Sequence, residues 1–140
     1  MIDDFTKQYF FLSNFYESPC TYEGLTYQSV EAAFQSAKTV RIEERTRFTL
    51  MNPSEAKRAG RRIALRQDWE QIKDTVMYDC LKSKFSDPAL AKRLIATGND
   101  ELREGKTCGD TYWGVCEGVG KNRLGKLLMK VRKELKEQQA

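Results

Sequence analysis

Residues 22–38 read Tyr-Glu-Gly-Leu-Thr-Tyr-Gln-Ser-Val-Glu-Ala-Ala-Phe-Gln-Ser-Ala-Lys, and they combine two signals that set the fold class. Residues 19–28 alternate side chains of different polarity around Gly24, which predicts a short β-hairpin. Ser29 is a suitable N-cap, and the helix formers after it predict a helix that ends near Thr39. A small N-terminal hairpin followed by helices indicates a mainly α fold with a little sheet (α+β).

Downstream of this stretch, sequence patterns predict four more helices. Asn52-Pro53-Ser54-Glu55 is a capping box with proline at the first helical position, which marks a helix start. Trp69 and the apolar residues after it recur at three- and four-residue steps, which indicates an amphipathic helix. The predicted spans are 52–61, 68–85, 88–96 and 122–136. Residues 99–121 are glycine-rich and irregular, and because the chain has no repeat or linker we expect a single domain over residues 1–140.

The composition limits the chemistry, because the 140-residue chain contains no histidine. Nucleophiles that depend on a histidine base are excluded, and so are haem and histidine-ligated metals. The four cysteines are scattered and form no Cys-x-x-Cys pair, so we expect free thiols, no metal site and no cofactor. Acid-base work must therefore fall to Asp, Glu, Lys, Tyr or Cys side chains.

Charge and hydropathy predict a cytoplasmic protein. No stretch approaches the roughly 20 apolar residues of a membrane helix, and Asp3 and Asp4 stand where a secretory signal has basic residues. The 24 Lys and Arg against 20 Asp and Glu give a net charge of +4, which suits an anionic ligand without requiring one. The basic run over residues 121–136 can attract nucleic acid, although such a run is more often the solvated face of a helix.

Three polar residues of the first predicted helix share one face. Glu31, Gln35 and Lys38 stand at i, i+4 and i+7, which at about 100° per residue brings them into line. Val30 and Phe34 flank this stripe, so we expect protein to cover it at least in part. The alternative is an exposed stripe of charges on a helix surface.

Two further segments suit a ligand site. Residues 10–16, Phe-Phe-Leu-Ser-Asn-Phe-Tyr, have neither helix nor strand periodicity and are expected to form a loop that lines a pocket, although Phe10, Phe11 and Phe15 taken singly are more typical of a core. Residues 109–115, Gly-Asp-Thr-Tyr-Trp-Gly-Val, combine a carboxylate, a tryptophan and glycines, which suits a base-stacking platform beside an acid. Neither a dinucleotide fingerprint nor a P-loop is present.

Together these motifs resemble the NADAR family, also called YbiA-like, in the right order and over almost the whole chain. The opening motif is made by Phe11-Leu12-Ser13-Asn14-Phe15, Gly24, Tyr27-Gln28-Ser29-Val30-Glu31, Phe34-Gln35 and Lys38. The middle helix is matched by Arg66, Asp68-Trp69, Lys73 and Met77, and the closing block by Asp110, Trp113-Gly114, Asn122, Leu124-Gly125 and Arg132. The chain departs from the family in having Ala32 where many members have histidine after the motif glutamate.

The resemblance implies a mainly helical N-glycosidase that cleaves the bond between ribose C1 and an exocyclic amine. Its implied substrates are ribosylamino-pyrimidine phosphates of riboflavin biosynthesis, or ADP-ribosylated guanine in DNA, in which case DNA is a partner. No metal is implied. The expected catalytic residues are Glu31, Lys38 and Asp110. The expected substrate-binding residues are Ser13, Asn14, Phe15, Gln35, Trp69, Trp113, Gly114 and Asn122.

Two routes are open for cleaving such a bond. In the first, Glu31 and Asp110 divide the work between activating water and holding the ribose hydroxyls or passing a proton. In the second, a neutral Lys38 exchanges with the leaving amine to form a Schiff base that water hydrolyses, which requires burial to lower the Lys38 pKa. The rival hypothesis is a non-catalytic module that binds ADP-ribose or another nucleotide. The polar stripe favours the enzyme, because a binding module has no need for a carboxylate and an amine that converge on C1.

Overall fold

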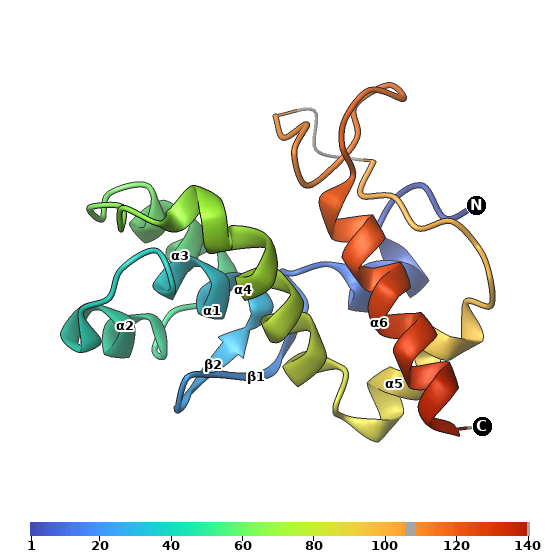
Figure 1. The fold of residues 1–140 in the computed structure, drawn as a ribbon, viewed down its shortest axis with the longest axis horizontal. Coiled ribbons are helices and arrows are strands. Elements are labelled where there is room, and N and C mark those ends of the chain that lie inside the picture. Colours follow the sequence, from blue (N-terminus) through green and yellow to red (C-terminus); the bar gives the residue numbers. More distant parts are fainter. Residues whose placement is uncertain (106–108, 140) are drawn as a thin grey trace. The chain divides into compact units, whose positions relative to one another are not determined.

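The computed structural model of the chain describes residues 1–105 and 109–139, and the chain divides into two compact units (Figure 1). One unit is Asn14–Lys84, coloured from blue to green in Figure 1. The other joins Met1–Ser13 to the chain from Phe85 onward. That a single domain spans residues 1–140 stays a prediction.

The unit that starts at Asn14 opens with the predicted hairpin. β1 (Glu17–Tyr22) pairs antiparallel with β2 (Leu25–Ser29). The two residues between the strands, Glu23 and Gly24, have φ angles of 46° and 88°. Positive φ at both positions suits the two-residue turn that joins twisted strands, and glycine adopts it without steric cost. The predicted hairpin is therefore confirmed.

The helix predicted after the hairpin is α1 (Val30–Ser36), the central element of this unit. Ser29 caps it as predicted, because its Oγ accepts a hydrogen bond of 3.1 Å from the backbone N–H of Ala32. The elements that pack around α1 are both strands, α2 (Ile42–Phe48), α3 (Pro53–Gly60) and α4 (Trp69–Lys84) (Figure 1). Every residue of α1 is buried as a result.

Two of the surrounding helices confirm predictions and one does not. α3 begins with the predicted capping box, in which Asn52 and Glu55 exchange side chain–backbone hydrogen bonds of 2.8 and 3.0 Å. α4 covers the predicted amphipathic span. The sequence does not predict α2, because no side chain caps its first turn and its Arg45 bonds instead to residues outside the helix.

The other unit contains two predicted helices, α5 (Pro88–Ala96) and α6 (Arg123–Gln139), which pack against each other (Figure 1). Gly98, with a φ of 70°, follows α5 as predicted. The N-terminal segment joins this unit through a parallel bridge between Ile2 and Leu102. The leucines buried in its core are Leu12, Leu90, Leu94, Leu102, Leu124, Leu127 and Leu128.

Three smaller expectations are wrong. Residues 10–12 of the segment expected to be a loop belong to a 3₁₀ helix, η1 (Lys7–Leu12). Phe10 is 42% exposed rather than part of the core, whereas Phe11 is buried. Cys116 is disulfide-bonded, while Cys20 and Cys80 are the free thiols that were expected. Within the described residues, no helix combines the length and the apolar character that crossing a membrane requires.

Candidate active site

The polar face of α1 is covered by protein. Glu31 and Gln35 are each only 7% exposed, and Lys38 is partly buried just beyond the end of the helix. The side-chain Nε2 of Gln35 donates a hydrogen bond of 3.1 Å to Glu31 Oε1. A covered stripe is therefore confirmed, and the alternative of an exposed stripe is wrong.

Asn14 supports the start of this helix. Its carbonyl oxygen accepts a hydrogen bond of 3.1 Å from the backbone N–H of Glu31. Its Nδ2 lies 3.6 Å from the sulfur of Met77, and its Oδ1 is buried with no hydrogen-bond partner in the described part of the chain. A buried acceptor without a donor costs stability, because it has lost its hydrogen bonds to water.

Two aromatic residues predicted to bind substrate make contacts within this unit. Trp69 is 5% exposed, and its ring lies 5.1 Å from the ring of Phe34 at a tilt of 58°. This pair packs α4 against α1. Phe15 is partly exposed and has the ammonium group of Lys57 5.8 Å from its ring centroid. A substrate contact stays a prediction for both residues.

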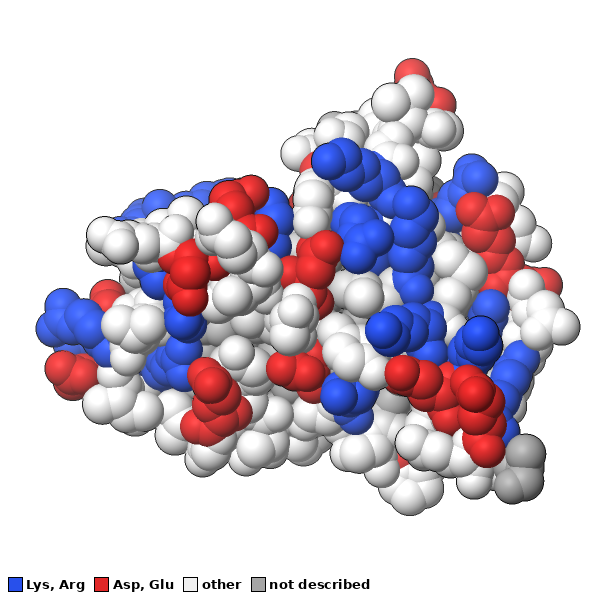
Figure 2. Space-filling model, viewed as in Figure 1, with Lys and Arg blue, Asp and Glu red and all other residues white. Residues whose placement is uncertain are grey.

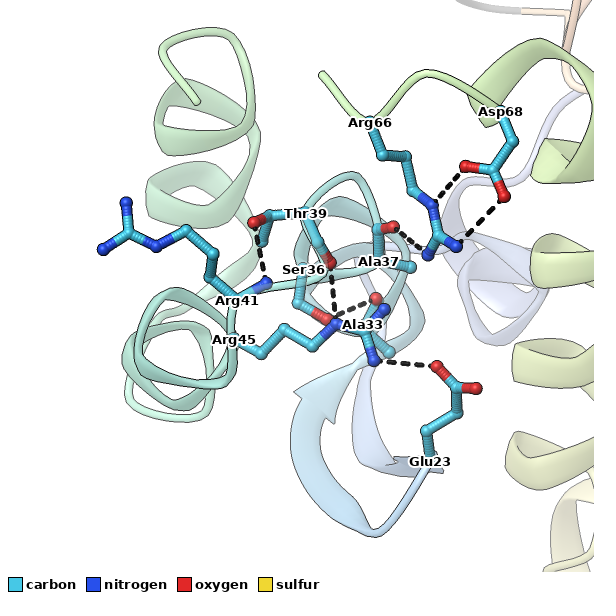
Figure 3. A network of polar contacts seen from close by, with 9 residues as sticks. All are labelled: Glu23, Ala33, Ser36, Ala37, Thr39, Arg41, Arg45, Arg66 and Asp68. Carbon is cyan, nitrogen blue, oxygen red and sulfur yellow. Dashed lines mark hydrogen bonds and ion pairs between the residues drawn. The ribbon is translucent and has the colours of Figure 1, made fainter. Parts of the chain in front are cut away.

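Two arginines hold the segment that carries Lys38 (Figure 3). Arg66 donates from Nη1 to the carbonyl of Ala37 at 3.4 Å, and from its backbone N–H to the carbonyl of Lys38 at 2.9 Å. Arg45 donates from Nε to the carbonyl of Thr39 at 2.8 Å. The arginines therefore satisfy three consecutive carbonyls after the last turn of α1, where the helix dipole favours positive charge.

Acidic side chains in turn fix both arginines (Figure 3). Asp68 accepts two hydrogen bonds from Arg66, at 2.6 and 3.2 Å. Glu23, in the hairpin turn, accepts one from Arg45 at 2.7 Å. The hairpin and the start of α4 thus both help to position the backbone around Lys38.

The surroundings of Lys38 change its acidity in the direction that a nucleophile needs. Burial lowers the pKa of Lys38 below its ordinary value, the nearby Glu31 carboxylate opposes this shift, and the Arg61 guanidinium reinforces it. A lower pKa leaves more of the amine neutral and able to attack carbon. The Schiff-base route requires a Lys38 pKa that burial lowers, and the shift has this direction.

Two cations on α3 and at its end were not singled out from the sequence. Lys57 and Arg61 lie one helical turn apart, and both are exposed. Neither forms an ion pair with a residue that the structure describes. Their sequence signal is only a basic stretch, which is common on solvated helices; what distinguishes Arg61 is its proximity to Lys38.

The predicted stacking loop lies in the other unit, and its carboxylate bonds to its own backbone. Asp110 Oδ1 accepts hydrogen bonds from the N–H groups of Tyr112 and Trp113, at 3.0 and 2.9 Å. Trp113 is partly exposed and meets the ring of Tyr112 edge-on at 4.9 Å. Gly114 is buried. Asp110 thus shapes the turn that presents Trp113.

Asn122, at the start of α6, also bonds to backbone. Its Nδ2 donates to the carbonyl of Leu102 at 2.9 Å, and its Oδ1 accepts from the N–H of Glu104 at 3.4 Å. A side chain at Gly125 would collide with this amide, at 2.5 Å from Nδ2. Asn122 therefore ties α6 to the segment before the loop, and its predicted substrate contact stays a prediction.

This unit contains one further titratable group, Glu104, which no sequence motif singles out. Burial, and to a smaller extent the carboxylates of Asp4 and Asp110, together raise the pKa of Glu104 to about 7. This grouping depends on hydrogen bonds between the chain around Ile2 and residues 101–103, which no local pattern reveals.

The basic run at the C-terminus is divided by the fold. Arg132 is buried and donates to Thr97 and to the carbonyl of Asp100, both at 2.8 Å, while Lys136 donates to the carbonyl of Gly98 at 2.5 Å. Other Lys and Arg side chains gather over α6 on the face that Figure 2 shows. Part of the run is thus structural and part is solvated surface.

The predicted site residues fall in both units. The unit from Asn14 contains Asn14, Phe15, Glu31, Gln35, Lys38 and Trp69, and the other contains Ser13, Asp110, Trp113, Gly114 and Asn122. A hollow of about 260 Å³ along residues 1–9 is lined by none of them. The described residues contain no cluster of three or more His, Cys, Asp or Glu side chains arranged to hold a metal ion.

Comparison with known proteins places this architecture in one family. A model of the NADAR domain matches residues 3–136. N-glycosidase YbiA of Escherichia coli (strain K12) is 39% identical over 128 residues, which cover 88% of this chain and 79% of that protein. Riboflavin biosynthesis protein VVA0006 of Vibrio vulnificus is 37% identical over 133 residues, which cover 91% of this chain and 36% of that protein.

The fold agrees with these sequence matches. The NMR structure of E. coli YbiA aligns with 99% of this chain and 89% of its own at a TM-score of 0.85, with 35% sequence identity. The mainly helical architecture with one small hairpin is therefore confirmed. Because the domain model and the structural alignment both span nearly the whole chain, the chain belongs to the NADAR family.

Proposed function

We propose that this protein hydrolyses the bond between ribose C1 and the exocyclic amine of a ribosylamino-pyrimidine phosphate. The general activity, hydrolysis of N-glycosyl compounds, follows from relatives that are named N-glycosidases. Three similar proteins are named riboflavin biosynthesis proteins, which supports an intermediate of that pathway as the substrate. These names favour the small molecule over ADP-ribosylated guanine in DNA.

The observation on which this proposal depends is the buried polar face of α1. Glu31 is buried on this short helix, Lys38 is partly buried just beyond its end and within electrostatic reach of Glu31, and burial lowers the pKa of Lys38. Burial of ionisable groups costs stability, and buried groups with shifted pKa values are frequent at functional sites. A module that only binds a nucleotide has no use for a carboxylate and an amine of lowered pKa, which supports catalysis over binding.

The proposed mechanism uses Lys38 as the nucleophile. A glycosylamine opens to an imine at C1, to which the neutral Nζ of Lys38 adds; the bond from C1 to the exocyclic nitrogen then breaks, and that nitrogen leaves as an amine after taking up a proton. Water adds to the resulting lysine Schiff base while Glu31 accepts its proton, and the sugar aldehyde departs from Nζ. Sugar phosphate and free amine are the products.

Two exposed cations that have no acidic partner among the described residues support a phosphorylated substrate. Lys57 and Arg61 have no acidic partner among the described residues, and Arg61 lies close enough to affect Lys38. Two cations one helical turn apart suit the dianion of a phosphate monoester. We propose that they bind the ribose phosphate.

The test compares three substrates with the purified protein. A ribosylamino-pyrimidine 5′-phosphate, its dephosphorylated form and ADP-ribosylated DNA are incubated separately, and released sugar is measured by mass spectrometry. We expect rapid release from the first and a KM at least about tenfold higher for the second, because the phosphate contacts are lost. In Arg61→Ala this difference should shrink. Faster release from the DNA would overturn the proposed substrate, and binding of all three without release would favour the nucleotide-binding module.

A further inference from the structure

The amide of Gln35 is held in one orientation between α1 and α3. It is 7% exposed, and its Nε2 donates to Glu31 Oε1 at 3.1 Å. Its Oε1 is buried and has no hydrogen-bond partner among the described residues. The opposite orientation of the amide would place this oxygen against the Glu31 carboxylate, where two acceptors repel each other. The fold thus leaves one polar atom unsatisfied while it supplies an N–H to Glu31.

Gly60, the last residue of α3, makes room for this amide. A Cβ at this position would lie 1.9 Å from Gln35 Oε1, 2.6 Å from Cδ and 3.2 Å from the Gln35 Cβ. Glycine in a helix is less stable than alanine, so the position carries an intrinsic cost. The clash would fall mainly on the end of a flexible side chain, so a methyl group here would displace the amide without unfolding the helix.

We propose that Gln35 is a positioning residue, seated against Gly60 so that its N–H group fixes the Glu31 carboxylate, and that it does not bind the substrate. This inference rests on the proposed function, because it assumes that Glu31 is catalytic, and it extends that function to a supporting residue pair. A carboxylate on a long side chain has several rotamers, and a fixed donor restricts it to the one that reaches the reacting water.

A double-mutant cycle tests the link between the two residues. Gly60→Ala and Gln35→Met should each lower kcat by about 10- to 100-fold with little change in KM, because geometry is lost and substrate contacts are kept. The double variant should be no worse than the worse single variant, because both act through one hydrogen bond. Gln28→Met is the matched control, since Gln28 is exposed on β2 and its activity should stay at the wild-type level.

Two outcomes of the cycle would overturn the proposal. A rise in KM with unchanged kcat in Gln35→Met would mean that Gln35 binds substrate. Losses that multiply in the double variant would mean that Gly60 and Gln35 act separately.

A second measurement decides the same question without turnover. In ¹⁵N-labelled protein, the side-chain NH₂ resonance of Gln35 should move when Glu31→Gln removes the charge of its acceptor. In Gly60→Ala it should approach the position and exchange rate of a solvent-exposed amide. An unchanged Gln35 side-chain resonance in Gly60→Ala would show that Gly60 does not position Gln35. If the wild-type protein releases no sugar from any substrate, the proposed function fails, while this spectrum still shows whether Gly60 seats Gln35 on Glu31.

Discussion

Helix α1 and the loop before α6 contain the same kinds of polar residue but use them differently. On α1, Glu31 accepts a hydrogen bond from the side chain of Gln35, and Lys38 follows the helix with a lowered pKa. In the loop region, Asp110 and Asn122 bond to backbone groups of nearby segments. A helix satisfies its own backbone, so its side chains are available for chemistry, whereas an irregular segment uses polar side chains to satisfy its main chain.

The comparison gives α1 the stronger claim to catalysis. Sequence position alone does not distinguish a carboxylate that shapes a turn, as Asp110 does, from one that takes part in catalysis. Substitutions that preserve shape but remove charge or nucleophilicity distinguish the two uses.

The largest effect is expected at Lys38. Lys38→Arg should reduce turnover by about 10⁴-fold or to background, because arginine keeps the charge but cannot become a neutral nucleophile. Borohydride added during turnover of the wild-type enzyme should reduce the Schiff base and leave a sugar adduct on the peptide that contains Lys38. The wild-type rate should rise with pH until Lys38 is neutral, at a pH below the ordinary lysine pKa.

Lys82→Arg serves as the control for this substitution, because Lys82 is an exposed residue of α4 paired with Asp79. An active Lys38→Arg enzyme, or turnover without any trapped adduct, would leave direct attack by water as the mechanism. Lys38 would then be an electrostatic partner of the substrate.

Glu31→Gln should abolish measurable turnover, with a loss of about 10³-fold, because the amide keeps the size of the carboxylate but accepts no proton from water. Circular dichroism should be unchanged, and Glu17→Gln, at an exposed position of β1, is the matched control. Near-normal activity of Glu31→Gln would show that the Glu31 carboxylate is not needed for catalysis.

A smaller effect is expected for Asp110→Asn. Asparagine retains the Oδ1 that accepts from Tyr112 and Trp113, so the turn should persist and the fluorescence of Trp113 should be unchanged. If the carboxylate mainly shapes the loop, kcat should fall by only about tenfold. A loss as large as that of Glu31→Gln would show that the loop and the helix share the chemistry equally.

Much of the fold follows from local patterns in the sequence. The hairpin, the cap at Ser29 and the capping box at Asn52 depend on residues a few positions apart, and all three were predicted. Helix α2 was not, because it has no side-chain cap and Arg45 bonds to Thr39 and Glu23 instead. A short helix held by tertiary contacts leaves no periodic signal.

The same distinction separates what was predicted of the site from what was not. Helical geometry predicts the shared face of Glu31 and Gln35, which hydrogen-bond to each other on α1, whereas Lys38 lies just beyond the last residue of that helix. Gly60 and Arg61 gain their interest only because α3 packs on α1, and Glu104 only because the chain near Ile2 pairs with residues 101–103. Contacts between segments far apart in sequence are invisible to spacing rules applied to a single chain.

The smallest effect concerns stability, and it tests whether the buried Glu104 carboxyl has a raised pKa in the folded protein. The pKa of Glu104 is raised to about 7 by burial and by Asp4 and Asp110, above its value of 4.5 in an unfolded chain. The folded state therefore retains a proton that the unfolded state releases, so this group favours folding at low pH and that contribution is lost as the pH rises from about 4.5 through 7.

Glu104→Gln mimics the protonated form and should remove this pH dependence. Its free energy of unfolding should match that of the wild type near pH 4.5 and exceed it by about 1 to 2 kcal/mol at pH 8; this figure is below what the full shift implies because the side chain is partly solvated. Urea unfolding across this pH range measures the difference, with Glu101→Gln as the control, because Glu101 is exposed and paired with Arg103. A gain in the free energy of unfolding that is constant with pH would mean that the Glu104 carboxyl does not titrate between pH 4.5 and 8. The acidic residues of this unit would then only shape the loop.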